Sequence, residues 1–304
     1  MKHTKRVLTL VLIFSLLLLS LTSLSSCDAK SDGTFNYTKN EFMGEEYYLA
    51  VVKDETLTEV VFPSEFKGLP VKSIGRNNKC INAEKIILPA SIQSIRAEAF
   101  EGFTKLREVE IQFSEAKSSL DIFLEIEGND GITVIIDENV TTLLKGICNA
   151  STVKKIVFEE GSKCTVIAAG AFEKSVITEL ILPASLQSVS ESAFADSALE
   201  KITLPEGLVG IGTYAFKNTK LTSLSIPASV TNIHSLAFSG CTQLSDIDFA
   251  GTKEEWKNAV YGNLNDPDLK IGIESETNNV AKTGIFLTVH CSDGDIQYSL
   301  KIEG

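Results

Sequence analysis

A repeat of fixed period runs through most of this 304-residue chain and limits the folds that it can adopt. The dipeptide Ala-Phe recurs every 22 residues, and in four copies a proline stands 11 residues before the phenylalanine. The phenylalanines are Phe172, Phe194, Phe216 and Phe238, an earlier copy is Phe100, and the prolines are Pro89, Pro183, Pro205 and Pro227. A period of ~20–50 residues indicates a repeat architecture, in which each unit buries its apolar face against its neighbours.

The three clearest repeats share the pattern L-x-x-I-x-L-P-x-x-L-x-x-I-x-x-x-A-F. They run over Ile177–Ala198, Leu199–Lys220 and Leu221–Gln243, weaker copies begin at Leu57, Ala83, Leu106, Ile132 and Val153, and a last copy begins at Leu244. Ile202 and Leu204 flank Thr203 with the period of two that a strand shows, and Pro205 ends that strand because proline lacks a backbone N–H. Phe216 then places its ring in the interior. We therefore expect an α/β-type repeat solenoid of the leucine-rich repeat class, with roughly nine coils of mostly short parallel β-strands joined by short turns or helical segments and with a cap at each end.

In several copies a serine stands two residues after the proline. The resulting pattern, L-x-x-I-x-L-P-x-S-L-x-x-I-x-x-x-A-F, resembles the BspA-type leucine-rich repeat, a group found in bacterial surface proteins. Three further segments resemble the entry and closing parts of such arrays, namely 68–75, 249–256 and 288–295. The resemblance covers roughly residues 35 to 300 and is lost between Ser114 and Asn129, where one coil is expected to be irregular. It implies adhesion to host proteins or to other bacteria, as in some members of the group.

Two caps are expected to cover the ends of the array, because terminal coils need a polar outer face. The organisation that we predict is a signal peptide over 1–26, a tether over 27–34, an N-terminal cap over 35–56, the solenoid over 57–262 and a C-terminal cap over 263–304. In the first cap we expect strands whose apolar residues alternate and point to one side. These residues are Phe35, Tyr37, Tyr47, Leu49 and Val51. In the second, Trp256 and strands near 285–289 and 296–302 are expected, with 262–282 as a surface loop.

The N-terminus has the features of an export signal. Three basic residues lie within 1–6, and a mostly apolar stretch follows from Val7 to Leu24. A retained membrane anchor is the alternative, since this stretch is at the short end of what spans a bilayer. Leu24-Ser25-Ser26-Cys27 resembles the bacterial lipobox, in which the cysteine sulfur carries diacylglycerol and the chain is cut before it. This resemblance implies a bacterial protein with a lipid attached at Cys27, held at a membrane and exposed at the cell surface or outer membrane.

The charge of the chain argues against nucleic-acid binding. Twenty-eight Lys and Arg residues against 40 Asp and Glu residues give a formal net charge of −12, whereas a nucleic-acid binder carries a basic surface. Removal of residues 1–26 takes away three basic residues and leaves 25 − 40 = −15. With three histidines in the chain, there is little room for a histidine-based metal site or catalytic triad, and we expect no cofactor and no catalytic activity.

The remaining chemically versatile residues fit structural roles in the repeat. Cys80, Cys148, Cys164 and Cys241 fall at repeat positions. Cys148 takes the place of the buried ring, Cys164 aligns with a core leucine, and Cys80 and Cys241 both stand three residues before the next repeat. A free cysteine packs as a small apolar residue, so we expect core packing for them, although an exported chain could also form disulfides. His234 falls at a variable, exposed position, and His290 stands beside Cys291 in the terminal segment. Gly207, Gly210 and Gly212 lie at coil corners and are interpreted as conformational glycines, because a phosphate-binding loop would need a following helix.

The outward side of the stacked strands is left as the candidate ligand-binding face, because solenoids present extended surfaces of this kind to partners. Its predicted members are Thr178, Glu179, Glu200, Lys201, Thr203, Thr222, Ser223, Ser225, Ser245, Asp246 and Asp248. The partner that we expect is a protein or another macromolecule. A structural role in the cell envelope is the alternative, and for an enzyme no group of residues satisfies the requirements of an active site.

Overall fold

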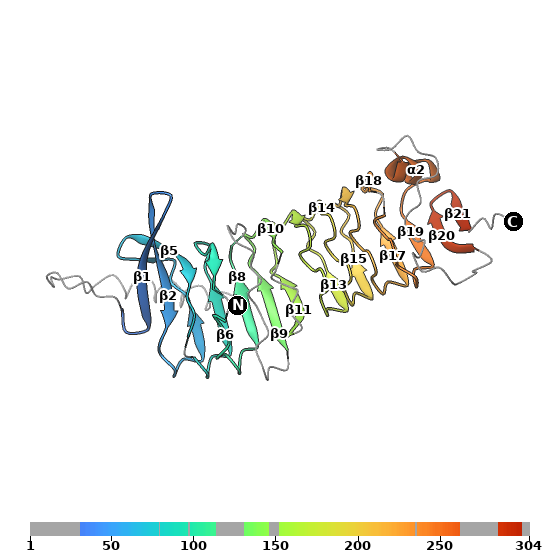
Figure 1. Ribbon diagram of the computed structural model, residues 1–304. Helices are drawn as coiled ribbons and strands as arrows, with labels where there is room; N and C mark the ends of the chain where they lie inside the picture. Colours follow the sequence, from blue (N-terminus) through green and yellow to red (C-terminus); the bar gives the residue numbers. More distant parts are fainter. Residues whose placement is uncertain are drawn as a thin grey trace, which may run out of the picture.

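The computed structural model describes residues 31–78, 80–96, 98–113, 131–145, 152–234, 236–261 and 285–299. These residues form an elongated array of coils, in which short strands stack side by side from one end to the other (Figure 1). A β-hairpin stands at the N-terminal end, and a short helix with a second hairpin stands at the C-terminal end (Figure 1). The irregular coil expected between Ser114 and Asn129 lies outside the described residues, as do the signal segment and Cys27.

One strand from each coil lies on a face that we call the front. These front strands are β3 (Glu59–Val61), β6 (Lys85–Leu88), β8 (Glu108–Ile111), β9 (Ile132–Ile136), β11 (Val153–Phe158), β13 (Glu179–Ile181), β15 (Lys201–Thr203), β17 (Ser223–Ile226) and β19 (Asp246–Phe249). The nine strands are separated by eight turns of the solenoid, and neighbours that pair are parallel. The predicted repeat solenoid with short parallel strands and little helix is therefore confirmed.

A second strand of two residues marks the return path of most coils. The return strands are β7 (Ser94–Ile95), β10 (Thr142–Leu143), β12 (Val166–Ile167), β14 (Ser188–Val189), β16 (Gly210–Ile211) and β18 (Asn232–Ile233). The last five form one continuous parallel sheet. Its register follows the sequence period, since Ser188 pairs with Gly210 and Gly210 with Asn232, each 22 residues further on.

The rings of the Ala-Phe dipeptides form a continuous stack inside the coils. The ring centroids of Phe172 and Phe194 are 4.8 Å apart, those of Phe194 and Phe216 are 5.3 Å apart, and those of Phe216 and Phe238 are 5.7 Å apart. The planes deviate by 16° at most. All four rings are buried, so each coil supplies one aromatic layer that only the next coil can cover, which is how a solenoid gains stability from its neighbours.

The corners of the coils use left-handed backbone at recurring positions. Lys174, Asp196 and Asn218 have φ of 61°, 59° and 56°, and Gly240 continues this series at 73°. A second series precedes each Ala-Phe dipeptide, at Gly170, Ser192, Tyr214 and Leu236. Left-handed backbone is costly for residues other than glycine, by about 1–2 kcal/mol each. The stacked coils therefore hold these corners in a conformation that the residues do not favour on their own.

The front strands, in contrast to the return strands, are divided into three sheets within the described residues. β3 to β11 form one sheet, β13 and β15 form a second, and β17 and β19 belong to a third. Where pairing continues, the residue after a strand donates its N–H to the last carbonyl of the preceding strand, as Glu159 does to Ile136 at 3.0 Å. Pro183, two residues after β13, and Pro227, directly after β17, occupy the equivalent place in their coils and have no N–H to donate. Pro205 occupies it too, yet β15 still pairs with β13, so the missing donor weakens the pairing without by itself abolishing it.

The N-terminal cap is an antiparallel hairpin of β1 (Phe35–Phe42) and β2 (Glu45–Val52). β2 pairs in parallel with β5 (Leu69–Ile74), which in turn pairs with the short β4 (Glu65–Phe66). Phe35 and Tyr37 are buried as expected, but in β2 Ala50 and Val52 are the fully buried residues. The expectation that Leu49 and Val51 lie on the same side as Phe35 and Tyr37 is therefore wrong. Leu49 and Val51 instead lie over Gly75, which has no side chain to exclude them.

At the other end, the array is closed by α2 (Lys253–Tyr261), β20 (Ile285–Cys291) and β21 (Gly294–Ser299). The helix begins at Thr252, whose side chain accepts the N–H of Glu255 while the Glu255 carboxylate accepts the N–H of Thr252, the reciprocal arrangement of a capping box. Trp256 is fully buried against Phe249. The loop expected over 262–282 lies outside the described residues. Of the helices in the described part of the chain, none has the length and apolar character to span a bilayer.

Candidate ligand-binding face

The residues predicted for the ligand-binding face do share the front of the solenoid. They lie on or directly before β13, β15, β17 and β19, and the members inside β13, β17 and β19 alternate with the buried Leu180, Leu224 and Ile247. The exposed members are Thr178, Glu179, Glu200, Lys201, Thr203, Thr222, Ser223, Ser225, Ser245 and Asp248, and Asp246 is half-buried. The alternation of the pattern therefore placed these side chains on one face, although nothing in the geometry assigns them a ligand.

Asp246 is the most constrained residue of this face. Its carboxylate accepts a hydrogen bond from the Ser245 hydroxyl at 2.5 Å and lies 3.3 Å from Nε2 of His290. These two contacts hold the pKa of Asp246 below its ordinary value. Nδ1 of His290 lies 3.1 Å from Asp295, so the imidazole bridges the last front strand and the terminal hairpin. The predicted exposure of His234 is confirmed.

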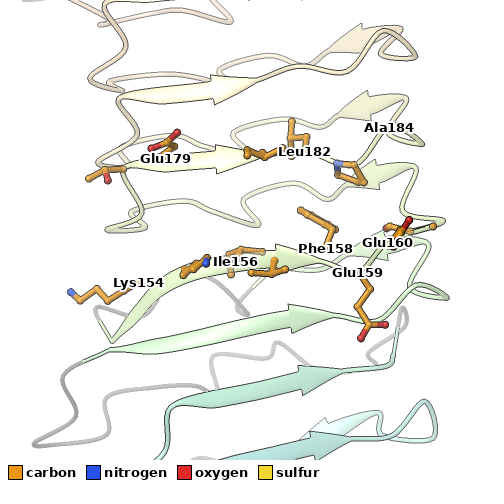
Figure 2. Close-up of a pocket in the computed structure, with 15 residues that line it drawn as sticks. Lys154, Ile156, Phe158, Glu159, Glu160, Glu179, Leu182 and Ala184 are labelled. Carbon is orange, nitrogen blue, oxygen red and sulfur yellow. The ribbon is translucent and has the colours of Figure 1, made fainter. Parts of the chain in front are cut away.

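A groove on the front of the solenoid was missed by the sequence reasoning. It lies between β11 and β13, where the front sheet is interrupted, and has a volume of about 740 Å³. We call it the β11–β13 groove, and it is lined by residues 154–162, Thr178, Glu179 and 181–184. Figure 2 shows Phe158 between the two strands, Lys154 at one end and Glu159 and Glu160 at the other.

The groove leaves Phe158 less covered than the residues at its place in the other coils. At the two inward positions of the front strands, Ile86, Val134 and Ile136 are fully buried. Beside the groove, the corresponding Phe158 is half-buried and Leu182 is 5% exposed. One sequence signal was available, because the copy that begins at Val153 runs 177 − 153 = 24 residues before the next begins, against 21 in the copy before it and 22 in the copy after it. Its corner after β11 is longer and lacks the proline.

The cysteines that the structure describes behave as core residues. Cys80, Cys164 and Cys241 are fully buried, as predicted, and Cys291 is half-buried; all four thiols are free. Burial raises the pKa of all four thiols, which is the opposite of what a thiolate nucleophile needs. In the described ranges, no group of three His, Cys, Asp or Glu residues is arranged to hold a metal ion. Cys148 lies outside the described residues.

The glycines Gly207, Gly210 and Gly212 were expected to provide an unusual backbone conformation, and the structure gives a different reason for one of them. None of Gly207, Gly210 and Gly212 adopts a positive φ. A Cβ on Gly212 would lie 2.7 Å from the carbonyl carbon of Ser190, whereas a Cβ on Gly210 would meet nothing within 4 Å. Gly212 therefore permits the close approach of two coils, and the interpretation as a conformational glycine is wrong for this residue.

Comparison with protein families gives one match, and it spans most of the chain. Six copies of the model described as the BspA type leucine-rich repeat region match residues 53–175 and 165–283. These ranges contain every front strand from β3 to β19. None of the curated proteins with which the chain was compared matches it.

Solved structures of bacterial leucine-rich repeat proteins are also similar. A leucine-rich repeat protein from Bacteroides ovatus is 20% identical, with 75% of this chain and 66% of that protein covered and a TM-score of 0.34. A leucine-rich cell surface protein from Faecalibacterium prausnitzii is 16% identical, with 78% and 98% covered and a TM-score of 0.27. The pneumococcal vaccine antigen PcpA is 14% identical, with 76% and 83% covered and a TM-score of 0.28. The chain thus spans slightly less than two thirds of the Bacteroides protein.

Proposed function

The chain belongs to the BspA-type leucine-rich repeat family, and on this premise we propose that it is an exported bacterial lipoprotein that binds a protein or another macromolecule through the front of its solenoid. The observation that carries the proposal is the row of exposed polar side chains on four consecutive front strands, β13, β15, β17 and β19. Such a row is a continuous, ordered surface, which is how repeat proteins engage extended partners.

The function that we propose is binding without catalysis. The thiols of Cys80, Cys164 and Cys241 are buried with raised pKa values, and His290 is engaged by two carboxylates that fix it between β19 and β21. In these arrangements the thiols pack in the core and the imidazole holds elements together, which supports a structural role for them.

The binding function is tested by an unbiased screen of the mature domain against extracellular-matrix and bacterial envelope proteins. A variant with Glu200→Lys, Lys201→Glu and Asp246→Lys should lose the captured partner, because all three changes fall on the proposed face. The matched control reverses Lys163 and Glu191, which are exposed but stand at a coil corner and after the return strand β14. Equal loss in both variants, or no partner in any fraction, would refute binding through this face. Recovery of envelope proteins alone would favour a scaffolding role over adhesion.

The lipid anchor is tested separately in cells. Replacement of Cys27 by Ala should release the protein from membranes, since two or more acyl chains on one residue give a stable anchor. Cys291→Ala, which removes a half-buried thiol far along the chain, should leave the protein in the membrane fraction. Protease treatment of intact cells should remove the solenoid if it is on the surface, and full resistance would refute that location.

A further inference from the structure

We infer that the tip of the first hairpin, formed by Phe42 and Met43, inserts into the lipid bilayer beside the lipid proposed for Cys27. Met43 is 89% exposed and Phe42 is 59% exposed, although both side chains are large and apolar. The inference rests on the proposed function, because it adds a second membrane contact next to the proposed anchor.

The half of the hairpin that carries the tip stands clear of the array. Figure 1 shows the turn between β1 and β2 beyond the neighbouring coils. No residue from Thr38 to Leu49 is buried, whereas Tyr37 and Ala50, which pair across the hairpin, are buried. The apolar surface of the tip therefore stays in water in the folded chain, and its transfer into an apolar medium is favourable.

The chain turns back along β1 just before this strand begins. The carboxylate of Asp32 accepts the N–H groups of Thr34 and Phe35 at 2.9 and 2.7 Å, which fixes a reversal of the backbone. Ser31 then forms an antiparallel bridge with Asn36. Since β2 occupies one side of β1, this bridge lies on the other side, and the chain that precedes Ser31 is directed toward the tip.

Continuation of the same register would bring the proposed lipid to the tip. Each step back from Ser31 meets a residue one further along β1, so Cys27 would stand opposite Asn40, two residues before Phe42. The four steps span about 13 Å when extended. β1 is the last strand of its sheet, and an edge strand can take a further strand. We therefore assign a bilayer, and not a partner protein, as the medium that covers the tip.

The charges around the tip permit contact with an uncharged lipid surface. Glu46 pairs with Lys39 and Glu45 pairs with Lys72, each at 2.7 Å. Glu41 is the carboxylate of the tip that stands outside these two pairs. Because most of the local charge is compensated, the contact should depend on apolar burial and not on anionic lipids.

The second contact would restrict the orientation of the array. A short polar tether leaves a domain free to rotate about its point of attachment. An apolar tip held in the bilayer next to the lipid removes much of this freedom. The same side of the solenoid would then face the membrane in every molecule.

The membrane contact is tested with the lipid-modified protein in phosphatidylcholine vesicles whose acyl chains carry bromine, which quenches tryptophan. The unaltered chain has one tryptophan, the buried Trp256. Phe42→Trp should lose about a quarter or more of its fluorescence, because interfacial segments reach ~5–10 Å into the bilayer. Gln297→Trp, exposed in the terminal hairpin, is the matched control and should lose no more than the unaltered protein. Equal quenching of the two variants, or none, would overturn the inference.

The mass of the N-terminal peptide from the same preparation separates this inference from the proposed function. A lipid on Cys27 without quenching at position 42 leaves the anchor in place and refutes the tip contact. An unmodified Cys27 refutes the anchor, and the inference falls with it.

The path of the chain along β1 is tested without lipid, in a Cys27→Ala background. Ala29→Cys with Thr38→Cys should form a disulfide under mild oxidation, because the two positions face each other in the continued register. Ala29→Cys with Asn36→Cys is the control, since Asn36 is also exposed on β1 but is two residues out of register. Mass spectrometry of the unreduced peptides measures both. Equal or preferred linkage at position 36 would refute the placement of Cys27 beside the tip.

Discussion

Nε2 of His290, in β20, lies 3.3 Å from Oδ1 of Asp246, in the last front strand. The other ring nitrogen lies 3.1 Å from Asp295 in β21. The carboxylates of Asp295 and Asp246 raise the pKa of His290 above its ordinary value of 6.5, because both contacts favour the protonated ring. One imidazolium therefore links the solenoid to its terminal hairpin.

We expect the stability of this end of the molecule to depend on pH. A raised pKa in the folded state gives a contribution that is complete below pH 6.5 and is lost as the pH rises through the folded-state pKa. Amide hydrogen exchange in β20 and β21 should therefore accelerate as the pH rises above 6.5, beyond the intrinsic rate increase. His290→Gln should remove this extra acceleration and His234→Gln should preserve it. An unchanged profile in His290→Gln would show that another group is responsible.

The ring stack should dominate the stability of the central coils. Phe194 lies between Phe172 and Phe216 and is buried, so Phe194→Ala leaves a cavity that its neighbours cannot fill and should lower the free energy of unfolding by about 3–5 kcal/mol. Phe42, which is 59% exposed at the tip of the first hairpin, is the control, and Phe42→Ala should change little. Urea unfolding followed by circular dichroism measures both, and comparable losses would contradict the stack as the main source of stability.

Two glycines of one coil should respond differently to the same substitution. The new methyl group of Gly212→Ala would lie 2.7 Å from backbone atoms of Ser190 and Glu191, and we expect a loss of about 1–3 kcal/mol. Gly210→Ala meets open space and should be neutral or stabilising by up to about 1 kcal/mol. Thermal unfolding of the two variants gives the comparison directly. Equal melting temperatures would mean that the coils can separate to admit the methyl group.

The turn of the first hairpin contains a residue that is poorly suited to it. Met43 has a φ of 54° and is followed by Gly44 at 81°, the left-handed pair in which two-residue hairpins favour Asn-Gly. Met43→Asn should therefore stabilise the hairpin by about 0.5–1 kcal/mol, and Met43→Val should destabilise it because a β-branched residue tolerates this backbone least. Amide exchange of β1 and β2 reports the local effect. The prediction fails if the two variants shift the exchange rates in the same direction.

Much of the fold could be predicted from the spacing of apolar residues. The period of 22 predicts which residues pair between coils, because Glu179 and Lys201 occupy the same place in successive copies. It also predicts the stacked rings and the burial of Cys164 and Cys241, since one buried position per coil can be read from its equivalents. These features depend on periodicity alone, and therefore they can be predicted from a single sequence.

Other features depend on details of backbone pairing that no periodicity encodes. The left-handed corners are occupied by Lys174, Asp196 and Asn218; aspartate and asparagine tolerate this backbone, but lysine does not indicate it, so the series is not evident from residue type alone. The parity of β2 was misjudged because Leu49 is more apolar than Ala50, although the small residue is the one that fits the interior. The β11–β13 groove follows from one missing N–H at Pro183 and one longer corner, which change the pairing without changing the pattern.

The unequal continuity of the two faces has a mechanical consequence. Backbone hydrogen bonds in a solenoid run along its long axis, so a pull on the molecule from both ends loads them directly. From β10 to β18 the return strands carry that load without a gap, whereas the front is interrupted twice over nearly the same length. The array should therefore bend with its return sheet as the hinge. Tension between the proposed membrane anchor and a bound partner would first separate β11 from β13 and β15 from β17, where no backbone pairing resists it.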